Sequence, residues 1–115
     1  MAEFKFEIED YLVTPEVNDF CEVASNCVNL YSKKNHDYGD SFNKGMNAIG
    51  PAYGIGRIFD KVNRLVTLSK STETACAVTD ESIEDTLKDL ACYAIMMLAY
   101  RKCQRINIHE QIELD

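Results

Sequence analysis

The sequence predicts an all-α protein, a helical bundle of about four main helices, and three observations support this fold class. Apolar residues recur at helical spacing in each of the longest stretches of the chain. Proline follows a capping or turn residue at Thr14-Pro15 and at Gly50-Pro51, where helices often begin. Strand-like alternation is confined to the two ends of the chain.

The length of 115 residues fits one domain with a modest core. No linker is long enough to divide it, so residues 1–115 are predicted to form a single domain with terminal arms at 1–13 and 106–115. Both arms carry apolar residues at the period of a strand, namely Phe4, Phe6, Ile8, Ile106, Ile108, Ile112 and Leu114. A short terminal β-ribbon and frayed ends are both open.

The first helix is predicted to begin at Thr14-Pro15 and to end near residues 33–35. Residues 33–42, rich in Asn, Asp and Gly, are predicted to form a loop before a short helix at 41–49. A plain helix connection is one interpretation of this loop. The other is a ligand-binding loop, because it also carries charged and aromatic groups at Lys34, Asp37 and Tyr38.

The next helix is predicted to begin at Pro51, and it carries an apolar stripe on one face. Its opposite face carries one acid and three cations, namely Asp60, Arg57, Lys61 and Arg64. Such groups at i,i+3 and i,i+4 can be surface ion pairs worth about 0.2–0.5 kcal/mol each. They are also the groups that a site for a metal ion and a phosphate would need.

The central helix is predicted over residues 80–105, with Asp80 as its cap and basic residues in its last turns. Residues 91–100 are almost entirely apolar, as in a helix surrounded by protein. Its large side chains exceed what a monomer of this size covers, at Tyr93, Met96 and Tyr100. We therefore predict a homo-oligomer, a dimer or a tetramer.

The acids of this helix at Glu81, Asp85 and Asp89 are spaced i, i+4, i+8 and so line one face. One interpretation is a solvated half of the helix. The other is a Mg²⁺ site, because Mg²⁺ prefers carboxylate oxygens together with the phosphates of a substrate.

Composition excludes several classes of function. A net charge of -7 argues against binding a nucleic-acid polymer, and the absence of a long apolar run argues against a membrane partner. No signal peptide is recognised, and the five cysteines show no metal-binding spacing, which indicates buried thiols in a reducing cytoplasm. No nucleophile, P-loop or HExxH motif is present.

Three strings, KKNHDYGDSF, GRIFDKVNRL and DESIEDTLKDLACYAIM, resemble the phage-encoded nucleotide-modification-associated domain family, in that family's order, over residues 33–97. The resemblance implies a nucleotide-handling protein in the cytoplasm of an infected bacterium.

A looser resemblance is to the all-α nucleotide pyrophosphohydrolases, the MazG and dimeric dUTPase group. It implies Mg²⁺-dependent hydrolysis of a nucleoside triphosphate to a monophosphate and pyrophosphate. Asp60, Asp85 and Asp89 would hold the ion, and Glu81 would orient water. The implied substrate contacts are Lys34, Asp37, Tyr38, Arg57, Lys61, Arg64 and Tyr93.

The match to this second group departs at two places. Thr86 stands where its pattern has Glu, and Asp60 with Asn63 stands where it has two Glu residues. Two alternatives to hydrolysis are therefore kept. The first is a protein that sequesters a nucleotide of host signalling without cleaving it, and the second is a structural or interaction protein.

Overall fold

Four α-helices make up the chain in a computed structural model, which describes residues 6–70 and 76–114. They are α1 (Pro15–Tyr38), α2 (Ser41–Ile49), α3 (Pro51–Ser69) and α4 (Cys76–Leu114), preceded by a 3-10 turn at Asp10–Leu12. Within these residues there is no strand, so the predicted all-α class is confirmed. None of the helices described is both long enough and apolar enough to span a membrane.

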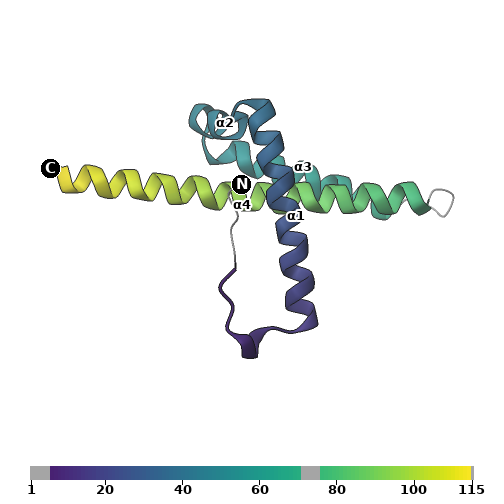
Figure 1. Ribbon diagram of the computed structural model, residues 1–115. Helices are drawn as coiled ribbons and strands as arrows, with labels where there is room; N and C mark the ends of the chain where they lie inside the picture. The colour runs from purple at the N-terminus through teal and green to yellow at the C-terminus, as the bar shows by residue number, and fades with distance from the viewer. Residues whose placement is uncertain (1–5, 71–75, 115) are drawn as a thin grey trace.

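The long helix α4 is the axis on which the other helices are arranged (Figure 1). Helix α3 packs against it from behind in this view, and α1 crosses it in front. Helix α2 packs on α3 at the upper end of α1. The crossing of α1 over the α3–α4 pair is where three of the four helices come together.

Helix α1 begins where the sequence predicts, because the Thr14 hydroxyl accepts a hydrogen bond from the Val17 amide at 3.2 Å. It does not end near residue 35, so the loop predicted at 33–42 is wrong. Gly39 adopts a left-handed conformation with φ 60° and donates its amide to Asn35, which caps the helix after Tyr38. Lys34, Asp37 and Tyr38 therefore lie on a helix.

Helix α4 is longer than predicted at both ends, running from Cys76 to Leu114. The predicted cap Asp80 lies inside it, and residues 106–114 are helical, so this tail does not form the strand that the sequence left open. Phe4, in the other candidate strand, lies outside the described residues. The physical reason for the longer helix is that neither glycine nor proline interrupts residues 76–114. Extending an existing helix gives the backbone of residues 106–114 its hydrogen bonds without a new nucleation step. This outweighs the preference of a short alternating apolar pattern for a strand.

The core is small and lies where α1, α2 and α3 meet the middle of α4. Its buried apolar side chains are Cys27, Phe42, Met46 and Cys92. Gly54 is also buried, and a Cβ atom there would lie 2.9 Å from the Met97 sulfur, so the small residue lets α3 approach α4 closely.

Residues 91–100 are not surrounded by protein within one chain, contrary to the sequence prediction. Ile95 and Leu98 are more than half exposed. Of the cysteines whose side chains are described, Cys27 and Cys92 are buried as predicted, whereas Cys103 is exposed. The molecule is correspondingly elongated, with a radius of gyration of 17.7 Å against about 13 Å for a compact chain of this length.

Candidate functional site

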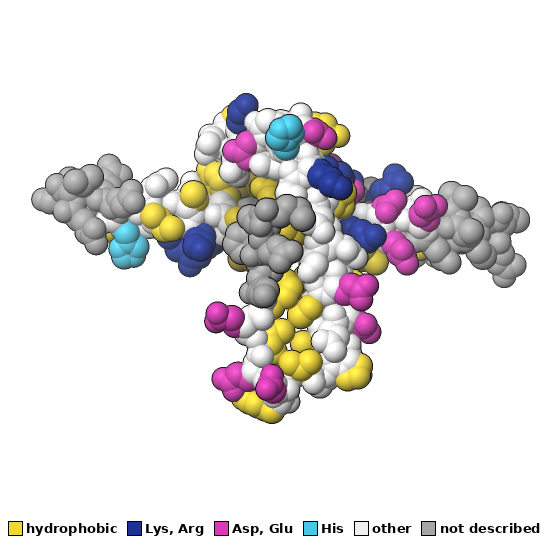
Figure 2. All heavy atoms as spheres, in the orientation of Figure 1, with side chains coloured by type: hydrophobic (Ala, Val, Ile, Leu, Met, Phe, Trp, Pro, Cys, Tyr) yellow, Lys and Arg dark blue, Asp and Glu magenta, His cyan; other side chains and the backbone are white. Residues whose placement is uncertain are grey.

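A pocket of about 290 Å³ opens at the crossing of α1 with α3 and α4. The last turns of α1 form one wall, the start of α2 closes one end, and the middle of α4 forms the floor. Its lining residues are Leu30, Tyr31, Lys34, Asn35, Tyr38, Ser41, Phe42, Lys61, Asp89, Cys92, Tyr93 and Met96. Figure 2 shows Lys and Arg side chains gathered near this crossing, while acidic side chains lie along the lower part of α1.

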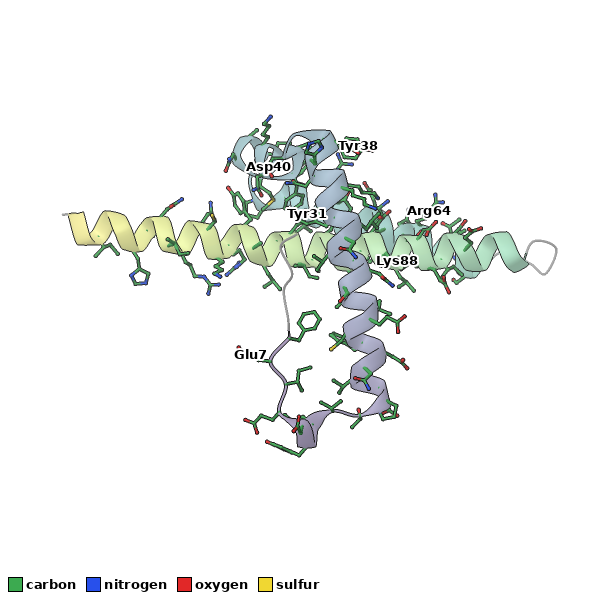
Figure 3. The ribbon with its side chains drawn as sticks, in the orientation of Figure 1. Glu7, Tyr31, Tyr38, Asp40, Arg64 and Lys88 are labelled. Carbon is green, nitrogen blue, oxygen red and sulfur yellow. The ribbon has the colours of Figure 1, made fainter. Side chains whose placement is uncertain are left out.

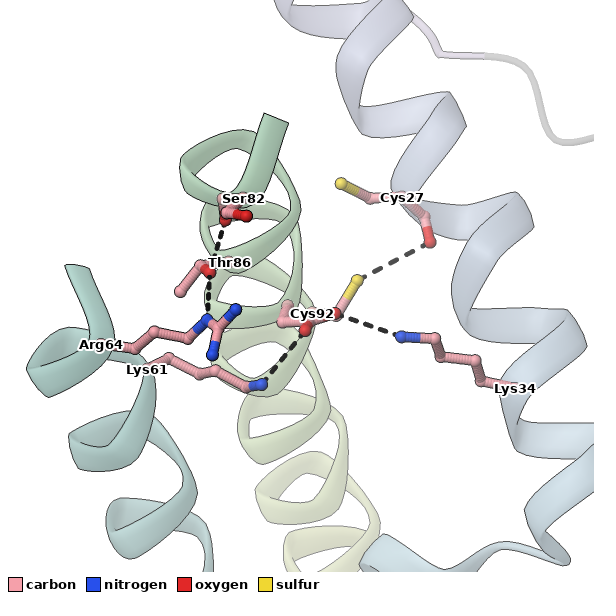
Figure 4. Close-up of polar contacts among 8 residues, drawn as sticks. Cys27, Lys34, Lys61, Arg64, Ser82, Thr86 and Cys92 are labelled. Carbon is pink, nitrogen blue, oxygen red and sulfur yellow. Dashed lines mark hydrogen bonds and ion pairs between the residues drawn. The ribbon is translucent and has the colours of Figure 1, made fainter. Parts of the chain in front are cut away.

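Asp89 joins the three long helices at the pocket. One carboxylate oxygen lies 3.2 Å from Nζ of Lys34 on α1, and the other lies 3.2 Å from Nζ of Lys61 on α3. Both contacts appear as dashed lines that converge on α4 (Figure 4). The Asp89 side chain keeps 26% of its exposure, so the carboxylate remains open to the pocket.

The electrostatics of this cluster favour an anion. Partial burial opposes the charge of Lys34, but the hydrogen bond and Coulomb attraction to Asp89 outweigh it and raise the pKa of this lysine. Lys34 therefore carries its charge at neutral pH, and the Asp89 carboxylate lies between the ammonium groups of Lys34 and Lys61. The cluster has a net positive charge that a bound anion can balance.

Aromatic rings surround the charged cluster. The Phe42 ring of α2 lies 6.0 Å from the Tyr93 ring of α4, centroid to centroid, and 5.8 Å from the Tyr53 ring of α3. Tyr31 and Tyr38 line the pocket from the upper half of α1 (Figure 3). Such rings offer flat apolar surfaces on which a planar ligand group can stack.

The pocket floor contains a thiol that is not reactive. Cys92 donates its Sγ–H to the backbone carbonyl of Cys27, with a sulfur to oxygen distance of 3.8 Å. Burial raises the pKa of the Cys92 thiol to about 11, and the neighbouring Cys27 makes a smaller contribution in the same direction. A thiol with this pKa stays neutral at physiological pH, so it does not act as a nucleophile.

The structure brings together five of the residues proposed from the sequence, namely Lys34, Tyr38, Lys61, Asp89 and Tyr93. The other proposed ligand contacts are directed elsewhere. Arg57 lies over the Tyr53 ring, 5.1 Å from its centroid. Arg64 donates to the Thr86 hydroxyl. The Asp37 carboxylate lies 3.3 Å from the His36 ring and is largely exposed.

The remaining acids are exposed on their helices, and none of them lines the pocket. They are Asp60 on α3 and Glu81 and Asp85 on α4. Among the residues described, no three acidic, histidine or cysteine side chains are grouped as a metal ion requires. The Mg²⁺ ligand set predicted from the sequence is therefore not assembled within one chain.

Sequence reasoning missed the pocket residues Tyr31 and Phe42. The signal for Tyr31 is present once α1 is extended to Gly39, because Tyr31, Lys34 and Tyr38 are spaced i, i+3, i+7 on one helix face. Phe42 has no such signal, since it reaches the pocket only through the position of α2 on α3.

One comparison with known proteins returned a match. The family model described as nucleotide modification associated domain 1 matches residues 34–100. These residues include both lysines, the Asp89 carboxylate and the Phe42 and Tyr93 rings. No curated protein and no solved structure matches the chain.

Proposed function

The chain belongs to the nucleotide modification associated domain 1 family, and from that premise we propose that its pocket binds a nucleotide through a phosphate group. The observation that carries this proposal is the pair of lysines that share one carboxylate, Lys34 and Lys61 on Asp89. Lysine is a common phosphate ligand, and two ammonium groups from different helices can contact one phosphate from two sides.

The aromatic wall supports a nucleotide over an inorganic anion. Tyr38 and Tyr93 lie beside the lysines and offer rings for stacking against a base, whereas the Phe42 ring is buried and lies 6.0 Å from the Tyr93 ring. The volume of about 290 Å³ is close to the lower end of the range for ligand pockets, about 300–1,000 Å³. A single nucleotide suits this volume, with its sugar or base partly exposed.

Binding without cleavage is the activity that the single chain supports best. The Asp89 carboxylate already has an ammonium group on each oxygen, and Asp60 and Asp85 do not join it in a group of three. These residues do not fit a Mg²⁺ ion as arranged. We therefore propose that the protein holds its nucleotide intact, as a sequestering protein does.

Mg²⁺-dependent pyrophosphohydrolysis is the second candidate. It is favoured by Asp85 and Asp89, which lie one turn apart on the same helix and would need further ligands from elsewhere. The two candidates differ in what they predict for the product and for the role of Asp89.

A nucleotide panel separates the candidates. Purified protein is incubated with mono-, di- and triphosphates and with cyclic nucleotides, in Mg²⁺ or in EDTA, and is then denatured and analysed by chromatography. We expect one class of nucleotide to leave free solution in both buffers and to return unchanged. Lys34→Ala and Lys61→Ala should each weaken its binding by roughly tenfold or more, the range for a charged hydrogen bond.

The matched control is Lys33→Ala, which removes an exposed lysine of α1 that does not line the pocket. It should bind as the wild type does. A monophosphate product that requires Mg²⁺ and is lost in Asp89→Ala would establish the hydrolase instead. If no nucleotide is bound or cleaved, the protein is an interaction protein.

A further inference from the structure

The α3–α4 pair carries two apolar rows that stay exposed among the residues that the structure describes. On α3 the row consists of Ile55, Phe59, Val62 and Val66, each between 43% and 65% exposed. On α4 the row consists of Leu87, Ala91, Ala94 and Leu98, and all four are exposed. Leu87 and Leu98 are 49% and 64% exposed. We define these eight residues as the outer face.

The contacts between α3 and α4 show that the two helices are antiparallel. Arg64 bonds to Thr86, Lys61 pairs with Asp89, and Gly54 lies against Met97, so residue numbers fall along α4 as they rise along α3.

Both rows point to the same side of this pair. Gly54 of α3 and Thr86 of α4 lie on the sides by which the two helices contact each other. Each exposed row begins one position later in the sequence, with Ile55 after Gly54 and Leu87 after Thr86. One position is a rotation of about 100°. In an antiparallel pair, equal rotations from the facing direction turn both rows to the same side. The outer face is therefore one continuous two-helix surface.

Helix α1 lies on the opposite side of the pair. Leu90 and Tyr93 continue, at helical spacing, the side of α4 on which Thr86 and Met97 contact α3. Asp89 and Cys92, which contact α1, stand one position before Leu90 and Tyr93, so α1 is rotated from α3 in the direction opposite to the exposed row. The pocket and the outer face thus lie on opposite sides of the α3–α4 pair. Tyr93 and Met96, which the sequence suggested as association surface, line the pocket instead, and Tyr100 donates to the Asn47 side chain at 2.6 Å.

The chain exposes more surface than a compact monomer of its mass does. The chain exposes 9566 Å², whereas a compact protein of 13.1 kDa exposes about 6,400 Å². This surplus of about 3,000 Å² is spread over the whole elongated chain, and one subunit of an obligate homodimer contributes about 1,000–2,500 Å² to its interface.

The exposed row of α4 can pair with the same row of a second α4 helix that runs in the opposite direction. Glu84, Leu87, Ala91, Ala94, Leu98 and Arg101 are spaced symmetrically about a point between residues 92 and 93. Against a second α4 that runs the other way, Leu87 lies opposite Leu98 of the second copy, and Ala91 lies opposite its Ala94. Glu84 then lies opposite Arg101 of the second copy. The small alanines at the centre allow the two helices to approach closely.

We propose that the outer face binds a second copy of this chain about a two-fold axis, with the two α4 helices antiparallel, to form a four-helix core from two α3–α4 pairs. A two-fold axis makes the same patch serve both subunits, as the symmetric row requires.

The first test is the oligomeric state measured by light scattering across micromolar concentrations. We expect the wild type to be a dimer or a larger oligomer with an even number of subunits. Leu98→Glu should lower the number of subunits in the oligomer. The matched control is Ile49→Glu on α2, which charges a residue of similar exposure (66%) outside the outer face and should leave assembly unchanged. Circular dichroism reports whether each variant stays helical.

The second test reverses exposed charges, which leaves folding intact. Glu84→Arg should weaken association several-fold by placing it opposite Arg101 of the second copy, and the double variant Glu84→Arg/Arg101→Glu should restore it. A monomeric wild type, an oligomer that survives Leu98→Glu, or equal association in the charge variants would each overturn the proposal.

Discussion

Arg64 of α3 donates a hydrogen bond from Nε to the Thr86 hydroxyl of α4, at a distance of 3.2 Å. Thr86 is 3% exposed and donates the same hydroxyl to the Ser82 carbonyl at 2.6 Å, so it is satisfied in both directions (Figure 4). The pattern of the all-α nucleotide pyrophosphohydrolases has a metal-binding Glu where this chain has Thr86. The structure assigns this position to the α3–α4 contact, where a small polar side chain is required.

Thr86→Val should lower the free energy of unfolding by about 1 kcal/mol, because it removes a hydrogen bond while Arg64 returns to solvent. Urea unfolding measures the difference. Thr86→Ser keeps the hydroxyl and is the control, which should recover most of the loss. Equal stability of the valine variant and the wild type would show that this contact does not hold α3 on α4.

Asp89→Asn should lower stability and raise nucleotide affinity. Its two ion pairs are partly exposed, so we expect a loss of about 1 kcal/mol. Removing the negative charge that competes for the lysines should strengthen nucleotide binding several-fold, as measured by calorimetry. Asp19→Asn, on the exposed half of α1, is the control for net charge. Weaker binding in Asp89→Asn would favour a metal-dependent site.

The contribution of Lys34 to stability should not change between pH 6 and pH 9. Its pKa in the folded chain is raised above the usual value of 10.5, although burial opposes this, because Asp89 favours the charged form. A raised pKa means that the stabilisation is present in full below 10.5 and is lost only as the pH rises further. Comparing urea unfolding of Lys34→Met and wild type at both pH values measures it, and a difference that changes within this range would contradict the assignment.

Two glycines of α3 should respond oppositely to alanine. Gly56 has open space around it, so Gly56→Ala should raise stability by about 0.5–1 kcal/mol through the lower entropy of its unfolded chain. A Cβ at Gly54 would lie 2.9 Å from the Met97 sulfur and 3.1 Å from the Met46 sulfur. Gly54→Ala should therefore be less stable than Gly56→Ala by about 1–2 kcal/mol in thermal or urea unfolding. Equal gains at both positions would show that the α3–α4 contact is loosely packed.

Cysteine alkylation should distinguish Cys103 from Cys92. At pH 8, Cys103 should react first because it is exposed, and Cys92 last because burial raises its pKa to about 11. The neutral Cys92 thiol should stabilise the fold in full below pH 9.0, and this stabilisation is lost as the pH rises towards about 11. Peptide mass spectrometry after timed alkylation gives the order, and in urea the two thiols should react alike.

Local patterns in the sequence were sufficient for much of the fold. The all-α class, the start of α1 at Pro15, the short helix at Ser41–Ile49 and the start of α3 at Pro51 all depend on caps, prolines and apolar spacing near in sequence. The end of α1 was misplaced because polar residues at 33–38 resemble a loop. Only the left-handed Gly39 decides where this helix ends.

The candidate site was predictable in part for the same reason. Lys34, Tyr38, Lys61, Asp89 and Tyr93 stood out by residue type and by family resemblance, and the pocket contains all five. Their interpretation as parts of a metal site stays a prediction. What the sequence could not show is that Asp89 pairs with lysines of two other helices, since these contacts join residues 55 and 28 positions away.

By itself, the sequence determined the all-α class, the acidic balance and the family, because each is encoded in neighbouring residues or in their order. Only the tertiary structure decided which face of α4 is covered. The packing of α1 buries Cys92 and places Asp89 in the pocket, and the packing of α3 leaves the row from Leu87 to Leu98 exposed. A helix that is apolar on several faces does not specify which face meets which neighbour, so the rotation and crossing of the helices had to be seen.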